Sequence, residues 1–295
     1  MGLDPALCPF FFLVNAAPSA PAAPERKSNF FLGFLLLPPR KRAALSAVYG
    51  YCRLIDDIVD EGLKKEDAAA QLEFWRAEVE RLYEGRPTHP VSQALLPHLQ
   101  EQNLPKDAFL EMIRGCEMDL NAARYETPED LESYMHGVAS SVGYMTVEIF
   151  GYKETSPDHI REFARCFGYA FQLTNIIRDV GADLELGRVY LPAADMKEAG
   201  YSLEALHRRE HSDAFIRLME IQYKRAKQYY LRARNMVDRR DRKGLLPAEV
   251  MAHIYEGLLE EIRLGRYRVL FQKQSLSPWR KARLAFKAWL YCHGF

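Results

Sequence analysis

The feature that most constrains this chain is a series of long helix-forming stretches with almost no strand signal between them. From about residue 38 onward, apolar residues recur at the three- and four-residue spacing of helices, interrupted by short breaks at glycine, proline or capping residues. These breaks delimit about eight helices, with Thr127, Ser156 and Ser202 as N-caps. The sequence therefore predicts an all-α fold, a bundle built as one main domain.

Composition narrows the classes of function. The chain has 295 residues, 48% of them hydrophobic, and Lys plus Arg balance Asp plus Glu at 40 each. Because there is no basic surplus, we expect no nucleic-acid partner. The five cysteines are scattered and form no CxxC pair, which argues against a disulfide framework or a zinc cluster and favours a reducing compartment. No stretch of about 20 apolar residues predicts a membrane span.

The first 26 residues differ from the rest of the chain. They are rich in alanine and proline around a short apolar run, and they lack the basic start of a signal sequence. We interpret residues 1–26 as a flexible, dispensable leader and residues 27–295 as a single folded domain.

Two of the expected helices carry acidic stripes among apolar residues. Between residues 40 and 62, four polar side chains follow at spacings of four, three and four, which places them on one face: Tyr49, Arg53, Asp56 and Asp60. Apolar residues cover most of the remaining circumference, so we expect this helix to be buried. Since an unpaired buried carboxylate is costly, the stripe predicts a cation beside it.

The stretch from residue 160 to 185 repeats this arrangement. Gln172, Asn175, Asp179 and Asp183 follow at spacings of three, four and four among large apolar residues. If the two helices face each other, four carboxylates and the amide oxygens form an all-oxygen site that suits Mg²⁺, with Mn²⁺ as an alternative ion. Mg²⁺ favours phosphate partners, so the implied ligand is a diphosphate. A single DxxxD helix is usually a solvated face, but two, each beside an arginine, favour a metal site.

Three ordered motifs carry a resemblance to the squalene/phytoene synthase family, which extends over residues 27–290. They are residues 49–60 (YGYCRLIDDIVD), 134–143 (YMHGVASSVG) and 172–183 (QLTNIIRDVGAD), the last continuing into residues 187–192 (GRVYLP). Residues 117–120 (EMDL) add to the likeness without an assigned role. The resemblance implies the isoprenoid synthase helical bundle, in which the two aspartate-rich helices face each other across a central cavity, and makes residues 27–295 a single catalytic domain.

By resemblance, residues of this chain take three kinds of role. The expected metal ligands are Asp56, Asp60, Asn175, Asp179 and Asp183. The residues expected to bind diphosphate are Arg53, Gln172, Arg178, Arg188 and Tyr190. The tyrosines expected at the reacting centre, where Arg53 and Arg178 also act, are Tyr49, Tyr134 and Tyr255. The residues expected to line a pocket for the prenyl tail are Phe30, Phe34, Val138, Ala139, Gly143 and Leu173.

Each assignment has a plainer structural alternative. Without its motif, Arg178 is typical of a helix-surface residue paired with an acid, and Tyr134 and Tyr255 are typical of core aromatics. The small residues from 137 to 143 permit close helix packing as readily as they make room for a prenyl chain.

The resemblance implies a transferase that joins two allylic isoprenoid diphosphates head to head. Residues 138–151 are most similar to bacterial presqualene diphosphate synthases of hopanoid pathways, which favours condensation of two farnesyl diphosphates, stopping there or continuing to squalene. One alternative is a phytoene synthase that acts on geranylgeranyl diphosphate in carotenoid synthesis; another, of a different class, is a non-catalytic assembly factor. NADPH use stays open, because family members that use it also lack a GxGxxG motif.

The stretch from residue 279 to 291 is basic and carries large apolar residues. It fits peripheral contact with an anionic membrane surface, although amphipathicity alone favours a helix packed on the bundle with its basic residues outward. We expect a cytoplasmic protein, with peripheral attachment to the inner face of the membrane as an additional option.

Overall fold

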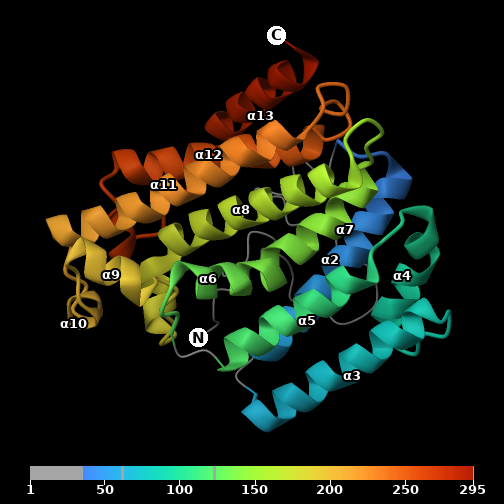
Figure 1. Cartoon of the computed structure of the whole chain (residues 1–295), viewed down its shortest axis with the longest axis horizontal. Coiled ribbons are helices and arrows are strands. Elements are labelled where there is room, and N and C mark those ends of the chain that lie inside the picture. The colour runs from blue at the N-terminus through green and yellow to red at the C-terminus, as the bar shows by residue number, and fades with distance from the viewer. Residues whose placement is uncertain (1–35, 61–62, 122–123, 295) are drawn as a thin grey trace.

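The computed structural model describes residues 36–60, 63–121 and 124–294, and this part of the chain is helical without strands, as predicted (Figure 1). The leader, Phe30 and Phe34 lie outside the described residues, so the domain boundary at residue 26 stays a prediction. The α-helices are α2 Pro39–Asp60, α3 Lys65–Tyr83, α4 Pro90–Glu101, α5 Lys106–Asn121, α6 Pro128–Met135, α7 Ser141–Phe150, α8 Pro157–Glu185, α9 Ala193–Ala199, α10 Leu203–His207, α11 Asp213–Met236, α12 Leu246–Leu264 and α13 Pro278–His293.

The described residues form more helices than the eight predicted, because short interruptions divide the longer stretches. A π-helical turn, His136–Ser140, separates α6 from α7, and a 3₁₀ turn, Arg268–Leu270, follows α12. The N-caps are confirmed: the hydroxyls of Thr127, Ser156 and Ser202 accept hydrogen bonds from backbone N–H groups three residues on.

Helix α8 is the centre of the bundle. It runs between α7 and α11 and also contacts α12 and both irregular turns (Figure 1). Its buried residues include large apolar side chains such as Phe167 and Ile177 on several sides. A helix that is apolar around most of its circumference must be enclosed by neighbours, which explains why the second acidic stripe lies inside the molecule.

Small residues bring the helices around this centre close together. A Cβ atom added to Gly137 would lie 2.5 Å from the Cα atom of Gly115 in α5, and one added to Gly168 would lie 2.9 Å from the backbone of Ala139. Real side chains do not tolerate such distances, so glycine is required at these crossings. The close-packing interpretation of the small-residue run is therefore confirmed for Gly137.

The last helix, α13, packs against α12 at the top of the molecule in Figure 1. A Cβ atom added to Gly257 of α12 would clash with Leu284 of α13, which identifies the closest point of the contact. In the part of the chain that the structure describes, no helix is both long and apolar enough to cross a membrane.

Candidate active site

The first acidic stripe lies on α2, at an interior position. Burial, and then repulsion from Asp60, raise the pKa of the Asp56 carboxyl well above its usual range. Its Oδ2 atom is buried and has no hydrogen-bond partner among the described residues. On the same face, Arg53 donates from Nε to Oδ2 of Asp57 at 3.0 Å, and the Tyr49 hydroxyl interacts with Arg53. The stripe therefore combines an acid that lacks compensation with a guanidinium one turn away.

The second stripe lies on α8 and is almost inaccessible to solvent. Gln172, Asn175, Asp179 and Asp183 are each at most 3% exposed. Both polar side-chain atoms of Asn175, and Oδ1 of Asp183, are buried without a hydrogen bond to any described residue. Burial raises the pKa of Asp183 well above its usual range, and the neighbouring Asp179 adds to the shift. Buried polar groups are normally paired, so these atoms indicate a place for a further ligand.

Arg188 joins the two stripes. It follows α8, and its Nη2 atom lies 2.8 Å from Oδ1 of Asp60 on α2, while its Nη1 atom lies 3.9 Å from Oδ2 of Asp119 on α5. Burial disfavours the charge of Arg188, but Tyr190, Asp119 and Asp60 outweigh burial and raise its pKa. The guanidinium is therefore firmly charged, and it is shared between acids of two helices.

Asp119 is the site residue that the sequence analysis missed. It accepts a hydrogen bond from the Tyr190 hydroxyl at 3.0 Å, and it acts electrostatically on Asp56 and Asp183, one from each stripe. The only sequence signal was its place in residues 117–120, which carried the resemblance without a role. Its function in the site depends on a contact with the loop after α8, some 70 residues later, which periodicity does not reveal.

Three tyrosines form a stack beside Arg188. The ring of Tyr134 lies 5.3 Å from that of Tyr190 and 5.5 Å from that of Tyr125, centroid to centroid. Burial, followed by the charge of Asp119, raises the pKa of both Tyr134 and Tyr190 well above the usual value. These phenols therefore stay neutral at ordinary pH. Tyr255 lies apart from this stack, with its ring 5.0 Å from that of Phe171.

Arg178 lies within the span of the α8 stripe, next to Asp179. Only 6% of it is exposed, and its Nε atom donates to Oδ1 of Asp179 at 2.8 Å, so the interpretation of Arg178 as a helix-surface residue is wrong. Lys273 lies 3.9 Å from the same oxygen, and burial together with the charge of Arg178 lowers the pKa of Lys281. Several cations thus gather where α8 meets the segment before α13.

Three of the predicted tail-pocket residues are buried, and a fourth, Gly143, lines a small apolar cavity. Val138, Ala139 and Leu173 are at most 3% exposed. Gly143 lines a cavity together with apolar residues of α7, α8 and α12, with the rings of α8 on one side: Phe163, Phe167 and Phe171. Apolar walls of this kind exclude water, but at about 30 Å³ the cavity is too small to hold a prenyl tail unless its walls move.

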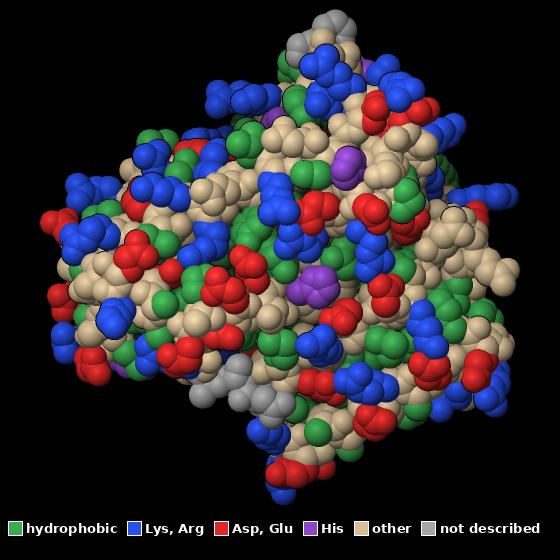
Figure 2. Space-filling model, viewed as in Figure 1, with side chains coloured by type: hydrophobic (Ala, Val, Ile, Leu, Met, Phe, Trp, Pro, Cys, Tyr) green, Lys and Arg blue, Asp and Glu red, His purple; other side chains and the backbone are tan. Residues whose placement is uncertain are grey.

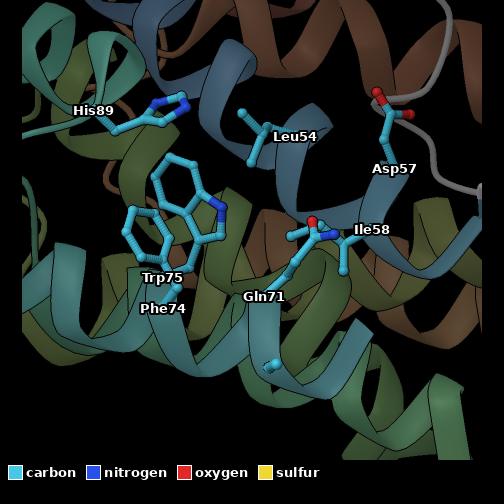
Figure 3. A pocket seen from close by; sticks show the side chains of 8 residues that line it. Leu54, Asp57, Ile58, Gln71, Phe74, Trp75 and His89 are labelled. Carbon is cyan, nitrogen blue, oxygen red and sulfur yellow. The ribbon is translucent and has the colours of Figure 1, made fainter. Parts of the chain in front are cut away.

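A larger cavity, of about 470 Å³, lies on another face of α2. Leu54, Asp57 and Ile58 line it from α2, and Phe74 and Trp75 line it from α3 (Figure 3). Asp57, the one acidic residue among those that line this cavity in the described structure, is already paired with Arg53. The residues of the two stripes do not line this cavity, so it does not belong to the site described above.

The donor set of the two stripes fits magnesium. Asp56 and Asp183 supply unpaired buried carboxylate oxygens, and Asn175 supplies an unpaired amide oxygen, which are the hard ligands that Mg²⁺ prefers. Within the described residues, no three acidic, histidine or cysteine side chains are close enough to hold an ion by themselves. Oxygen atoms of water or of a diphosphate would therefore have to complete the coordination, as is usual for Mg²⁺.

Comparison with known proteins decides the family. The model of the squalene/phytoene synthase family matches residues 23–283, which is most of the chain. The chain belongs to the squalene/phytoene synthase family. This is a family of head-to-head isoprenoid synthases, which are prenyltransferases acting on isoprenoid diphosphates.

The chain is similar to several named phytoene synthases and to solved structures of a dehydrosqualene synthase and a squalene synthase. The 15-cis-phytoene synthase of Synechocystis sp. is 34% identical over 89% of this chain and 80% of its own, and relatives from Synechococcus elongatus and Arabidopsis thaliana are also named phytoene synthases. Among solved structures, a dehydrosqualene synthase is 30% identical with a TM-score of 0.80, covering 92% of this chain and 94% of its own. A squalene synthase from Alicyclobacillus acidocaldarius is 29% identical with a TM-score of 0.74, covering 82% and 90%.

Proposed function

We propose that this chain condenses two molecules of geranylgeranyl diphosphate head to head and releases phytoene as a C40 product. The observation that carries this choice is the 34% identity to the 15-cis-phytoene synthase of Synechocystis sp. over 89% of the chain. The sequence analysis favoured two farnesyl diphosphates and presqualene diphosphate, with phytoene synthase as the alternative. The named relatives favour that alternative.

The second candidate is condensation of two C15 farnesyl diphosphates. It is supported by the dehydrosqualene synthase whose structure superimposes with a TM-score of 0.80, and this route would include the squalene and hopanoid pathways considered from the sequence. Both candidates use the same diphosphate site and differ in the length of the prenyl tail that the protein must accept.

We assign the acids of α2 and α8 to magnesium. Asp56, Asp60, Asp179 and Asp183, with Asn175, would hold the ion, and the unpaired oxygens of Asp56 and Asp183 support this assignment. When bound, the ion supplies positive charge that neutralises the diphosphate leaving group.

The arginines of the site bind and orient the diphosphates. Arg178 and Arg188 are charged and partly or fully buried, so their guanidinium forks can donate several hydrogen bonds to phosphate oxygens in a low-dielectric surrounding. As the allylic C–O bond of one substrate breaks, its electron pair leaves with the diphosphate, and these guanidinium groups stabilise the growing negative charge. Arg53, one turn from Asp56, is placed to act on the second diphosphate.

The tyrosines stabilise the carbocation, and the apolar walls exclude water from it. The allylic cation left by ionisation is stabilised by the ring faces of tyrosines such as Tyr134 and Tyr255. The double bond of the second substrate attacks the cation, and loss of a proton closes a cyclopropane. Because the phenols are neutral and weakly acidic, released diphosphate is the better acceptor for that proton. Gly143 and the phenylalanines of α8 keep water from quenching the cation.

Loss of the second diphosphate then allows rearrangement of the cyclopropane, and a second proton loss ends the reaction at phytoene. Proton loss needs no reductant, whereas formation of squalene, the more reduced C30 product, would need one hydride from NADPH. We therefore expect the C40 reaction to proceed without NADPH.

We also propose that the protein works at a membrane surface. Substrates with C20 tails and a C40 hydrocarbon product partition into lipid, since each buried CH₂ group favours the apolar phase by about 0.8 kcal/mol. A peripheral enzyme would collect the substrate and return the product without exposing either to water.

Product analysis tests the proposal. Purified protein would be incubated with Mg²⁺ and either geranylgeranyl or farnesyl diphosphate, with and without NADPH, and products identified by mass spectrometry. The proposal predicts phytoene from the C20 tube regardless of NADPH. A C30 product from the C15 tube alone would establish the second candidate, and no product in either tube from folded protein would favour the assembly-factor class.

A further inference from the structure

The outer side of the last helix exposes large aromatic side chains. Trp279 is 85% exposed, Phe286 is 60% exposed and Trp289 is 39% exposed. Spacings of seven and three residues place them on one side of α13, and the rings of Phe286 and Trp289 stack with centroids 6.0 Å apart. Contiguous exposed apolar groups of this size mark interaction surfaces rather than ordinary solvent-facing helix.

The opposite side of α13 already holds the helix on the bundle. Ala288 and Cys292 are buried, and Leu284 lies in close contact with Gly257 of α12. The packing that the sequence analysis favoured is therefore present, yet it uses only this inner side. The aromatic residues of the outer side are additional to what the packing requires.

The charge of α13 selects the kind of surface that it fits. The helix contains four Lys or Arg residues and no acidic residue. Arg280 is paired with Glu261, whereas Arg283 and Lys287 are exposed beside the aromatic stripe. Figure 2 shows basic and hydrophobic side chains together over α13, at the top of the molecule. Tryptophan rings flanked by exposed basic groups are typical of helices that lie in the headgroup region of an anionic bilayer.

The segment that leads into α13 borders the charged part of the candidate active site. Phe271, which is 64% exposed and precedes α13, lines a cavity of about 140 Å³ together with Arg178 and Asp179. Lys273, two residues later, lies 3.9 Å from Asp179. An exposed apolar ring therefore lies beside cations that suit a diphosphate, on the segment that connects the site to α13.

We propose that the outer face of α13, formed by Trp279, Arg283, Phe286, Lys287 and Trp289, docks onto the surface of an anionic lipid bilayer. This inference rests on the proposed function only in giving the docking its purpose, which is transfer of an isoprenoid diphosphate from the lipid to the site. The docking itself requires no turnover.

Vesicle binding by the full chain tests the docking. Cosedimentation would be measured with vesicles of phosphatidylcholine containing phosphatidylglycerol and with vesicles of phosphatidylcholine alone. The intact protein binds the anionic vesicles, and W279S/F286S binds them at least tenfold more weakly. Because each basic side chain near an anionic surface contributes a factor of about five, R283Q/K287Q weakens binding about 25-fold. The matched controls are F74S and K64Q/K65Q. They alter exposed side chains of α3 and of Lys64, which precedes α3, at the opposite end of the molecule (Figure 1), and they retain wild-type binding.

Tryptophan fluorescence supplies a second readout. Trp75 is 4% exposed, so a blue shift on adding vesicles reports Trp279 and Trp289. The docking is refuted if the intact protein does not bind anionic vesicles, or if W279S/F286S binds as well as the wild type. Turnover with detergent-dispersed substrate is measured separately. Loss of vesicle binding with retained turnover in detergent separates a docking defect from a failure of the proposed reaction.

Discussion

Arg188→Ala offers a sharp test of how the site is balanced before ligands arrive. Arg188 pairs with Asp60 at 2.8 Å and lies 3.9 Å from Asp119, and its side chain and that of Asp60 are each 24% exposed. Removing one partner of a buried pair costs about 3–5 kcal/mol, and partial exposure reduces this to about 2 kcal/mol here. For a chain of this size, that corresponds to a fall in Tm of about 4 °C.

Magnesium should reverse part of this loss. In the wild type, an ion that binds Asp60 must displace the Arg188 guanidinium. In Arg188→Ala this guanidinium is absent, so the carboxylates of Asp60 and Asp119 can bind the ion without displacing a cation. Mg²⁺ at ten times its dissociation constant would then raise the Tm of the variant by about 3 °C. In the absence of substrate, the wild type should gain less. Differential scanning calorimetry with and without Mg²⁺ measures both shifts.

Arg234→Ala is the matched control. Arg234 is another largely buried arginine shared between two acids, Glu249 at 3.2 Å and Glu256 at 2.8 Å. Its removal should lower the Tm by a similar amount, without any additional gain from Mg²⁺ beyond that of the wild type. If Mg²⁺ stabilises the wild type and Arg188→Ala equally, Asp60 is not a metal position held by Arg188 and the reasoning fails.

Three further predictions follow from the same contacts. Asp183→Asn should lower Mg²⁺-dependent turnover by about 1000-fold. The control Asp158→Asn alters an exposed acid on the first turn of the same helix and should retain turnover. Near-normal activity of Asp183→Asn would show that Asp183 is not a metal ligand. Gly137→Ala should destabilise the fold by about 1–3 kcal/mol because its Cβ meets Gly115, whereas Gly50→Ala, with nothing within 4 Å, should be neutral or stabilising by up to about 1 kcal/mol; denaturant titrations that rank them the other way would contradict the packing. Burial raises the pKa of Asp56 and Asp183, so above about pH 4 the native ligand-free protein binds more protons than the unfolded chain. Its stability therefore falls as pH rises toward the raised pKa values. The Tm measured against pH should decline less steeply in Asp56→Asn, and an unchanged slope would count against the raised pKa of Asp56.

Much of the fold follows from local sequence information. The apolar surround of residues 172–183 predicts a buried helix, and α8 is enclosed on several sides. N-caps at Thr127, Ser156 and Ser202 follow from side-chain chemistry alone. No local signal predicted the π-helical turn at His136–Ser140, where Gly137 packs closely against Gly115 on a different helix.

Local sequence pattern likewise predicted some features of the candidate site and not others. Periodicity placed each acid on a face, and the structure gives Asp56 and Asp183 unpaired buried oxygens as a metal site requires. Periodicity could not reveal that Arg188, in the segment after α8, pairs with Asp60 of α2, or that Asp119 accepts a hydrogen bond from Tyr190, since both contacts join residues far apart in the chain. Nor does local pattern distinguish a C15 from a C20 tail, which depends on cavity depth.

The most direct test of the central claim is a competition between equal amounts of geranylgeranyl and farnesyl diphosphate for the purified protein with Mg²⁺, with products identified by mass spectrometry. The account predicts that phytoene predominates without NADPH, and that chelating the metal or substituting Asp183 with asparagine abolishes it. Predominance of a C30 product would overturn the assignment of the C20 substrate, and phytoene formed equally well by Asp183→Asn would contradict catalysis at the carboxylates of α2 and α8.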